Sequence, residues 1–121
     1  MKTKTLLFFI SLIALFVLAA CQPAAEYDIR GTWKYLMTDT NGNTYDDGTI
    51  TFSGSPAKGT YLEVNIYEVE YKGEYLVKGT ALTLTGDETW QGVAADADHI
   101  SGTWQHSDGF SGTFTAVRKA P

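Results

Sequence analysis

The chain repeats one short pattern, Ile29–Trp33 (IRGTW), which returns as Ile100–Trp104 (ISGTW) and as Phe110–Phe114 (FSGTF). Each copy alternates a large apolar residue, a polar residue, glycine, threonine and an aromatic residue. A period of two is typical of a β-strand with one buried and one exposed face. The first copy opens the part of the chain expected to fold, and the other two close it. The pattern therefore predicts a sheet whose first and last strands meet.

The sequence after residue 28 predicts an all-β fold. It contains seven or eight short alternating runs separated by turn residues, and it has no stretch with a helical period. Connections this short join antiparallel neighbours, because parallel pairs need crossovers of about a dozen residues or more. We therefore expect a small eight-stranded antiparallel up-and-down barrel, in which closure removes the exposed edges. An open β-sandwich is the alternative.

The third run, at about 58–66, is expected to bury Leu62, Val64 and Ile66 and to expose Glu63. The apolar residues that follow are odd-numbered: Tyr67, Val69, Tyr71, Tyr75 and Val77. A change of phase by one residue turns a strand's core face outward unless a bulge or turn intervenes. The sequence thus predicts a bulge or turn near 66–68. It also predicts that an acidic run lies on the outer faces of these strands, with a basic partner as the alternative: Glu63, Glu68, Glu70 and Glu74.

The N-terminus has the pattern of a targeting segment. Lys2 and Lys4 precede 15 residues, 6–20, that are apolar except for Ser11. A membrane-spanning helix needs ~20 such residues, so a cleaved signal peptide is expected. The stretch 18–21 (LAAC) resembles the lipobox of bacterial lipoproteins, which implies cleavage before Cys21 and lipid attachment to its thiol. An ordinary secretory signal with a spare cysteine is the alternative. The expected organisation is a signal peptide at 1–20, a lipidated tether at 21–28 and one domain at 29–119.

The same resemblance predicts a location in the cell envelope. Gln22, rather than aspartate, follows the cysteine, which implies the outer membrane if the host is Gram-negative. Residues 21–121 keep seven of the nine basic residues and all 14 acidic ones, a formal charge of −7. A body this negative is unsuited to nucleic acid and to docking on anionic lipid. Cys21 is the only cysteine, so no disulfide forms within the chain. We expect a monomer that contacts the membrane through its lipid.

The first strand carries a second resemblance. Gly31-Thr32-Trp33 resembles the G-x-W signature of lipocalins and the wider calycin group, and the likeness covers about 29–119. It implies that Trp33 plugs one end of the barrel and that a basic residue of the last strand, here Arg118, lies over its ring. Avidins also begin with G-T-W, but no matching set of polar ligand contacts follows here.

The bulky residues of the predicted strands are expected to fill the interior: Trp33, Tyr35, Phe52, Tyr75, Trp90, Trp104, Phe110 and Phe114. Four aromatic residues are the candidate ligand contacts near an open end: Tyr35, Tyr75, Trp90 and Trp104. The lipocalin-like resemblance implies a non-enzymatic protein that binds a small apolar or amphipathic molecule or acts as a scaffold. The alternative is an interaction module, such as an inhibitor of an extracytoplasmic hydrolase. No cofactor is expected.

Three groups of polar residues at strand ends and turns are interpreted as solvated loop residues, and no metal or catalytic site is predicted from them. They are the calcium-loop-like Asp39, Asn41 and Asn43, the set Asp96, Asp98 and His99, and the pair His106 and Asp108.

Overall fold

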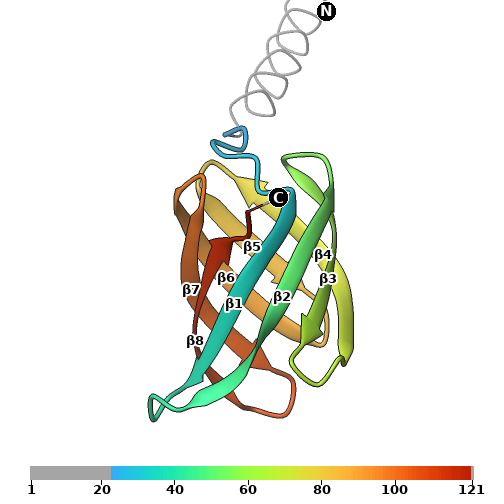
Figure 1. The fold of residues 1–121 in the computed structure, drawn as a ribbon. Coiled ribbons are helices and arrows are strands. Elements are labelled where there is room, and N and C mark those ends of the chain that lie inside the picture. The colour runs from blue at the N-terminus through green and yellow to red at the C-terminus, as the bar shows by residue number, and fades with distance from the viewer. Residues whose placement is uncertain (1–22, 121) are drawn as a thin grey trace, which may run out of the picture.

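The computed structural model describes residues 23–120, so the predicted signal peptide at 1–20 and the lipid attachment site Cys21 lie outside the described residues. Eight strands are connected in chain order, and each pairs with its neighbours in an antiparallel sense. β1 pairs with both β2 and β8, which closes the barrel (Figure 1). The expected eight-stranded up-and-down barrel is therefore confirmed, and the open sandwich is excluded. The strands are β1 (Gly31–Asp39), β2 (Thr44–Gly54), β3 (Lys58–Asn65), β4 (Glu70–Lys78), β5 (Ala81–Thr85), β6 (Glu88–Asp96), β7 (His99–His106) and β8 (Ser111–Arg118).

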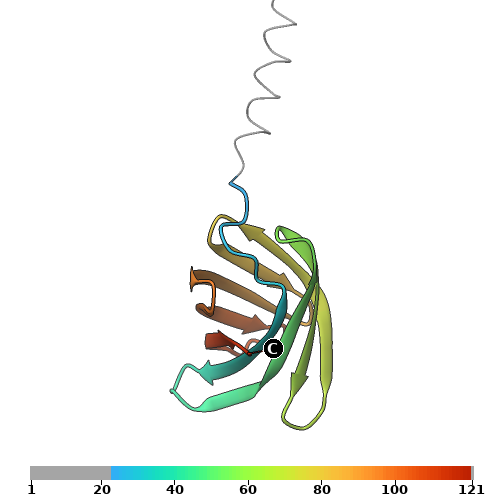
Figure 2. The ribbon, with the colours of Figure 1, turned by 45° about the horizontal axis from the view of Figure 1, so that its top comes forward.

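The barrel has two distinct ends. The chain enters at the end where the turns 55–57, 79–80 and 97–98 lie, and we call this the tether end (Figures 1 and 2). The connections 40–43, 66–69, 86–87 and 107–110 lie at the opposite end, which we call the far end. Within residues 23–120, no element is an apolar helix of the length that a membrane crossing requires.

The tether end is closed by Trp33. Its side chain is completely buried, and its indole nitrogen donates a hydrogen bond to the Ile29 carbonyl at 2.8 Å. The Arg118 guanidinium lies over the indole ring, 4.5 Å from its centroid. The same guanidinium donates to the carbonyls of Arg30, at 2.8 Å, and Asp28, at 2.6 Å. Gly31 has a φ of +114°, a conformation that side-chain-bearing residues rarely adopt, and a Cβ there would lie 3.4 Å from Nη1 of Arg118.

The segment that leads into β1 also packs on the tether end. Glu26 donates a backbone hydrogen bond to the Gly79 carbonyl at 2.9 Å, and Gly79 donates to the Ala24 carbonyl at 3.0 Å. Ala25 and Tyr27 contact the core. Residues 24–27 are therefore held against the β4–β5 turn, so the described chain begins at the tether end.

The interior is packed with apolar side chains. Gly92 of β6 shows how tightly: a Cβ there would lie 2.8 Å from Cζ of Phe114, so the ring rests directly on the strand backbone. The buried apolar residues are Ile29, Trp33, Tyr35, Met37, Ile50, Phe52, Tyr61, Tyr75, Val77, Leu82, Leu84, Trp90, Ala94, Ile100, Trp104, Phe114 and Ala116.

The expected orientation of β3 is wrong. Glu63 lies opposite Ile50 of β2, and Tyr61 lies opposite Phe52. Directly opposed residues share a face of the sheet, so Glu63 and Tyr61 point inward while Leu62 is on the outer wall. The expected turn near 66–68 is present, with Glu68 donating a backbone hydrogen bond to the Asn65 carbonyl at 2.9 Å. It does not change the phase, because the inward residues are odd-numbered in both β3 and β4. The prediction failed because it assigned the core face by hydrophobicity alone, and here the inward position holds a carboxylate.

Four residues expected inside are exposed: Ile66, Tyr67, Val69 and Phe110. They belong to the connections at the far end and not to strands. Alternation buries a side chain only where the backbone is held in the sheet, and these segments have left it. They are therefore available to contact other molecules.

Candidate functional site

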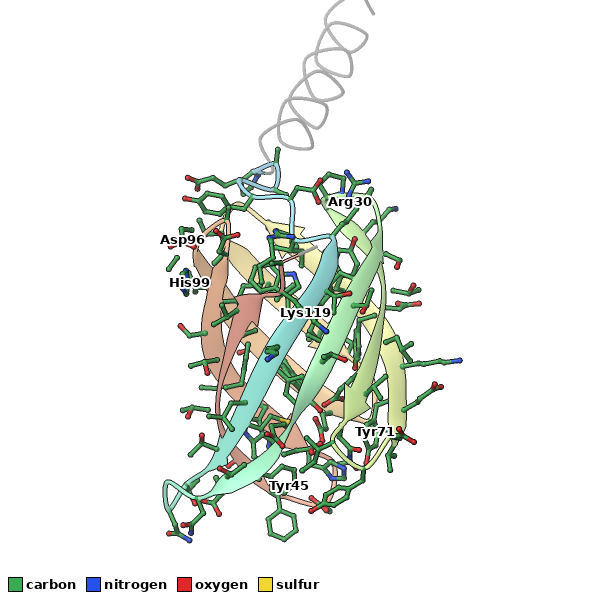
Figure 3. The ribbon with its side chains drawn as sticks, in the orientation of Figure 1. Arg30, Tyr45, Tyr71, Asp96, His99 and Lys119 are labelled. Carbon is green, nitrogen blue, oxygen red and sulfur yellow. The ribbon has the colours of Figure 1, made fainter. Side chains whose placement is uncertain are left out.

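Exposed apolar side chains gather at the far end of the barrel. Tyr67 is 77% exposed, Ile66 61% and Phe110 59%. Tyr45, at the start of β2, and Val69 are also exposed. We call these five residues the rim. Tyr45 and Tyr71 both lie at this end of the barrel (Figure 3). Clustered exposed apolar residues are typical of binding surfaces.

The rim is connected to the core by an aromatic stack. The Tyr45 ring lies 4.3 Å from the Trp104 ring, tilted by 31°, and 6.1 Å from the Phe110 ring. Trp104 is buried, and its indole nitrogen is shared between the carbonyls of Thr113, at 3.0 Å, and Thr38, at 3.1 Å. Those two hydrogen bonds hold Trp104 as a fixed platform. Tyr45 and Phe110 cover it from the solvent side.

Three carboxylates, Asp46, Glu63 and Glu88, lie on the inner face at the far end. We call them the acidic triad. Asp46 of β2 lies opposite the buried Met37, and Glu63 opposite the buried Ile50, so both share the interior face. Glu88 begins β6, two residues before the buried Trp90. Glu63 is 2% exposed, and Glu88 is 8% exposed.

The triad is only partly satisfied by hydrogen bonds. Trp90 donates its indole N–H to Glu88 Oε2 at 3.0 Å. The Tyr35 hydroxyl donates to Asp46 Oδ2 at 3.4 Å. Glu63 Oε1 is buried and has no hydrogen-bond partner among the described residues. Burying a neutral polar group without a hydrogen bond costs roughly 2–7 kcal/mol. Burying an ionised carboxylate without a partner costs more.

Burial shifts the titration of the whole cluster. Burial and, to a lesser extent, the charge of Glu88 together raise the pKa of Glu63 to about 8, while the Tyr35 hydroxyl acts in the opposite direction. Burial also raises the pKa of Glu88 and that of Asp46. Desolvation disfavours the charged form of a carboxyl group, and neighbouring negative charges add to the effect. Glu63 is therefore mostly protonated at neutral pH.

The candidate ligand residues divide between the two ends. Tyr35 and Trp90 lie together, with ring centroids 5.5 Å apart at 73°, and each donates a hydrogen bond to a member of the triad. Trp104 lies beneath the rim. Tyr75 is near the tether end, where its hydroxyl donates to the Ser55 carbonyl and its ring packs on Phe52 at 5.3 Å. The structure thus brings three of the four toward the far end, and their contact with a ligand stays a prediction.

Sequence reasoning missed the acidic triad. The sequence prediction places Glu63 on the outer face, and it singles out neither Asp46 nor Glu88. A signal was available in the parity: Glu88 is even-numbered, as are Trp90 and Ala94, and Glu63 is odd-numbered, as is Tyr61. Counting in twos from the aromatic residues would have placed both glutamates inside.

The polar groups at strand ends form local contacts. Asp39 Oδ1 accepts backbone hydrogen bonds from Asn41 and Asn43, both at 2.9 Å, as in an ordinary turn. The remaining members form ion pairs: His99 with Asp96 at 2.9 Å, Asp98 with Arg118 at 3.3 Å, and His106 with Asp108 at 2.8 Å. Within residues 23–120, no three His, Cys, Asp or Glu side chains are arranged to hold a metal ion.

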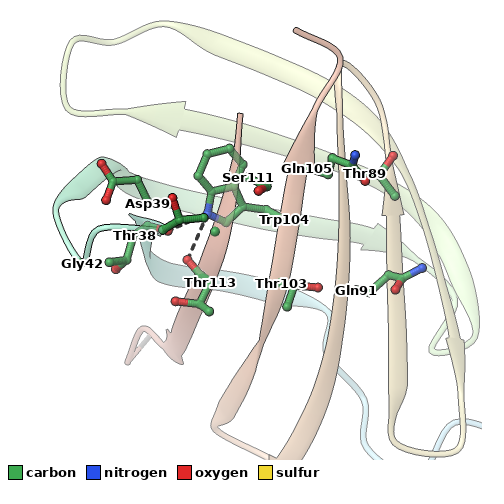
Figure 4. A pocket seen from close by; sticks show the side chains of 12 residues that line it. Thr38, Asp39, Gly42, Thr89, Gln91, Thr103, Trp104, Gln105, Ser111 and Thr113 are labelled. Atoms are coloured by element: carbon green, nitrogen blue, oxygen red, sulfur yellow. Dashed lines mark hydrogen bonds between the residues drawn. The ribbon is translucent and has the colours of Figure 1, made fainter. Parts of the chain in front are cut away.

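The outer wall carries an open groove of about 690 Å³ over β6, β7, β8 and the end of β1 (Figure 4). Its lining is almost uncharged: Thr38, Asp39, Thr40, Gly42, Thr89, Gln91, Thr103, Trp104, Gln105, Ser111, Gly112 and Thr113. These side chains point away from the barrel interior, and Trp104 reaches the groove only with the edge that bonds to Thr38 and Thr113. The groove is separate from the acidic triad.

Comparison with known proteins identifies the fold. No family model and no curated protein matches the chain. Among solved structures, a redesigned β-barrel (b11L5F_LGL) is similar at 20% identity and a TM-score of 0.61, over 80% of this chain and 100% of that one. A de novo designed fluorescence-activating β-barrel is similar at 17% identity and a TM-score of 0.56, over 76% and 94%. The redesigned barrel mFAP1, bound to DFHBI, is similar at 22% identity and a TM-score of 0.57, over 74% and 94%. At these identities, what the chain shares with them is the closed antiparallel β-barrel fold.

Proposed function

We propose that this protein is a lipid-anchored, non-enzymatic protein of the cell envelope that binds a small amphipathic molecule at the far end of its barrel. The rim would contact the apolar part of the ligand, and the acidic triad would contact its polar part. One observation carries the proposal: a buried, unpartnered carboxylate oxygen, Glu63 Oε1, at the same end of the barrel as five exposed apolar side chains. Buried ionisable groups with strongly shifted pKa values are concentrated at functional sites.

The packed interior favours a ligand site at the far end over one inside the barrel. The middle and base of the barrel are filled by buried side chains, so a deep apolar cavity of the kind typical of transport lipocalins is not the site supported here. The resemblance to lipocalin-like domains of bacterial lipoproteins supports the general role. The similar redesigned barrel mFAP1 is bound to DFHBI, which supports the capacity of this architecture to hold a small molecule.

Binding at the far end is tested with six-carbon amphiphiles. The full chain is placed in phosphatidylcholine vesicles, and tryptophan emission is followed during titration with n-hexylammonium, n-hexanol and hexanoate. At least one of them is expected to give a saturable change, because Trp90 and Trp104 lie at this end. Phe110→Ser should weaken that binding, while Val93→Ser should leave it unchanged. Val93 is a matched control, 53% exposed on the outer wall of β6. Equal loss in both variants, or no saturable change with any probe, would contradict the proposal.

The anchor is tested at Cys21. Substitution of Cys21 by Ser is expected to prevent lipid attachment, because the modification requires a thiol. The variant should therefore leave the membrane fraction and lack the mass of the lipid, as measured by fractionation and mass spectrometry. Two or more acyl chains anchor stably because each buried methylene contributes ~0.8 kcal/mol. A variant with unchanged mass and membrane association would show that the lipobox interpretation is wrong.

A second candidate function is supported by the rim itself. Tyr67 and Ile66 are more exposed than an apolar contact to a small molecule requires, which favours a protein partner such as an extracytoplasmic hydrolase. The two functions differ in an observable way. A protein partner would be recovered from envelope extract by the wild-type chain and lost with Tyr67→Ser, whereas a small-molecule site gives saturable binding of a six-carbon amphiphile to the purified chain with no protein partner present. Substitution of Glu68 and Glu70 by Lys tests whether negative charge beside the rim contributes to recovery of that protein partner.

A further inference from the structure

We propose that the polar part of the ligand is an organic ammonium group, bound by Glu63 with support from Asp46 and Glu88. This inference rests on the proposed function and specifies its ligand class as a small amphipathic cation.

Charge is the first reason. Three carboxylates from β2, β3 and β6 converge on the inner face of the far end. Within residues 23–120, no lysine or arginine forms an ion pair with any of them. The basic group that acts on Glu88 is His106, which lies opposite it and is paired with Asp108. A cationic ligand would provide the positive charge that the protein does not.

Position is the second reason. Asp46 is partly exposed and is joined to Tyr35, whereas Glu63 is buried deeper. The carboxylates therefore extend from the surface inward, and Glu63 Oε1 at the inner end still lacks a donor among the described residues. An ammonium group has N–H donors to give to such an oxygen. Hydrogen bonds between charged partners are about twice as strong as neutral ones.

The aromatic surroundings are the third reason. Tyr35, Tyr61 and Trp90 are buried on the same inner face. Aromatic faces attract organic cations, and the attraction grows when the pair is removed from water. Metal ions are a poorer match, because the described His, Cys, Asp and Glu side chains nowhere form a three-ligand group. The apolar part of the ligand would then lie against Tyr45 and Phe110, beside the Trp104 platform.

The titration of Glu63 gives the binding of a cation a specific pH dependence. With its pKa raised to about 8, Glu63 holds a proton at neutral pH and must release it to pair with a cation. The affinity for a cation should therefore rise with pH up to about 8 and level off above it. The groups that act on Glu63 or are acted on by it come from five strands: Tyr35, Asp46, Tyr61, Tyr71 and Glu88. His106 and Asp87 act on Glu88 beside it.

The test compares three probes with the same tail: n-hexylammonium, n-hexanol and hexanoate. The full chain in phosphatidylcholine vesicles is titrated by tryptophan emission from about pH 6 to about pH 9. An alkylammonium resembles a lysine side chain, with a pKa of about 10.4, and stays charged over this range. We expect n-hexylammonium to bind about tenfold or more tightly than the other two at the upper pH, which corresponds to one pKa unit of interaction. Its binding should release one proton below the pKa of Glu63.

Substitutions separate charge from shape. Glu63→Gln should weaken the binding of n-hexylammonium by about tenfold or more and abolish its pH dependence. The binding of n-hexanol should be unchanged. Asp46→Asn provides a second variant, with a smaller loss. Glu70→Gln, at an exposed position at the start of β4, is the matched control and should change nothing.

The outcomes distinguish the two proposals. If n-hexanol binds as tightly as n-hexylammonium, and Glu63→Gln affects neither, the ligand is not a cation, although binding at the rim stands. If CaCl₂ displaces n-hexylammonium competitively, the triad is a metal site and the proposal of an organic cation is wrong. If none of the three probes gives a saturable change, both proposals fail.

Discussion

Trp33→Ala is expected to lower the free energy of unfolding by about 3–5 kcal/mol. The indole is completely buried at the tether end, and its nitrogen is hydrogen-bonded to Ile29. Its removal leaves a cavity that a closed barrel cannot collapse to fill, because every strand is paired on both sides. It also removes the surface on which the Arg118 guanidinium rests, 4.5 Å from the ring centroid. Urea denaturation followed by circular dichroism measures the loss.

Two variants test the explanation of that loss. Trp33→Phe keeps an aromatic face for Arg118 but gives up the hydrogen bond and part of the volume, so its cost should be intermediate. Val117→Ala is the control, because Val117 is exposed on the outer wall of the same closing strand. Exposed substitutions change stability by roughly 0.5 kcal/mol or less. A Trp33→Ala cost as small as that of Val117→Ala would show that Trp33 does not close the barrel.

Glu63→Gln is expected to stabilise the protein on the alkaline side of neutrality. The carboxyl group of Glu63 has a folded-state pKa of about 8 against an ordinary value of 4.5. The folded protein thus binds more protons than the unfolded chain between these values, and stability falls as pH rises through this window. At about 1.36 kcal/mol per unit, the upper limit of the effect is roughly 5 kcal/mol. Glutamine keeps the shape and has no charge to bury.

The measurement is the unfolding free energy of both proteins from about pH 4 to about pH 9. The variant should match the wild type near pH 4, where Glu63 is protonated, and exceed it by a growing margin up to the pKa of Glu63. Asp28 cannot mimic this effect, because its pKa is lowered to about 2, and its contribution changes only at more acid pH. A pH-independent difference between the proteins would mean that Glu63 is ionised and satisfied in the folded state.

The expected stabilisation bears on function. A buried acid that weakens the fold at neutral pH is characteristic of a site kept for binding and not for packing. The same substitution should therefore improve stability and impair n-hexylammonium binding. If Glu63→Gln raises stability but leaves n-hexylammonium binding unchanged, Glu63 destabilises the fold without binding the cation.

Most of the fold was predictable because its determinants are local. The repeated pattern of Ile29–Trp33, Ile100–Trp104 and Phe110–Phe114 alternates with the period of a strand, and the short connections allow only antiparallel neighbours. The structure of the turn after β1 was predictable for the same reason. Asp39 accepts hydrogen bonds from two following backbone amides, as its place in a loop of turn-forming residues predicts.

The candidate site was only partly predictable. Tyr35, Trp90 and Trp104 were chosen as aromatic residues on inward positions, and the structure places them at the far end. The acids beside them were not chosen, because a carboxylate is expected on a solvated face and hydropathy assigned Glu63 there. The rim was missed for the opposite reason, since Phe110 and Tyr67 look like core residues.

The sequence by itself determined the all-β class, the number and order of strands, and the closure of the sheet between its first and last strands. It also contains the lipobox-like stretch at 18–21, which lies outside the described residues. Only the tertiary structure decided which face of β3 points inward and which apolar residues escape burial. The physical reason is that hydrogen-bond register, and not the hydropathy of a single strand, sets the direction of each side chain. Once Ile50 and Glu63 are opposite each other, the carboxylate lies inside the barrel, whatever its preference for water.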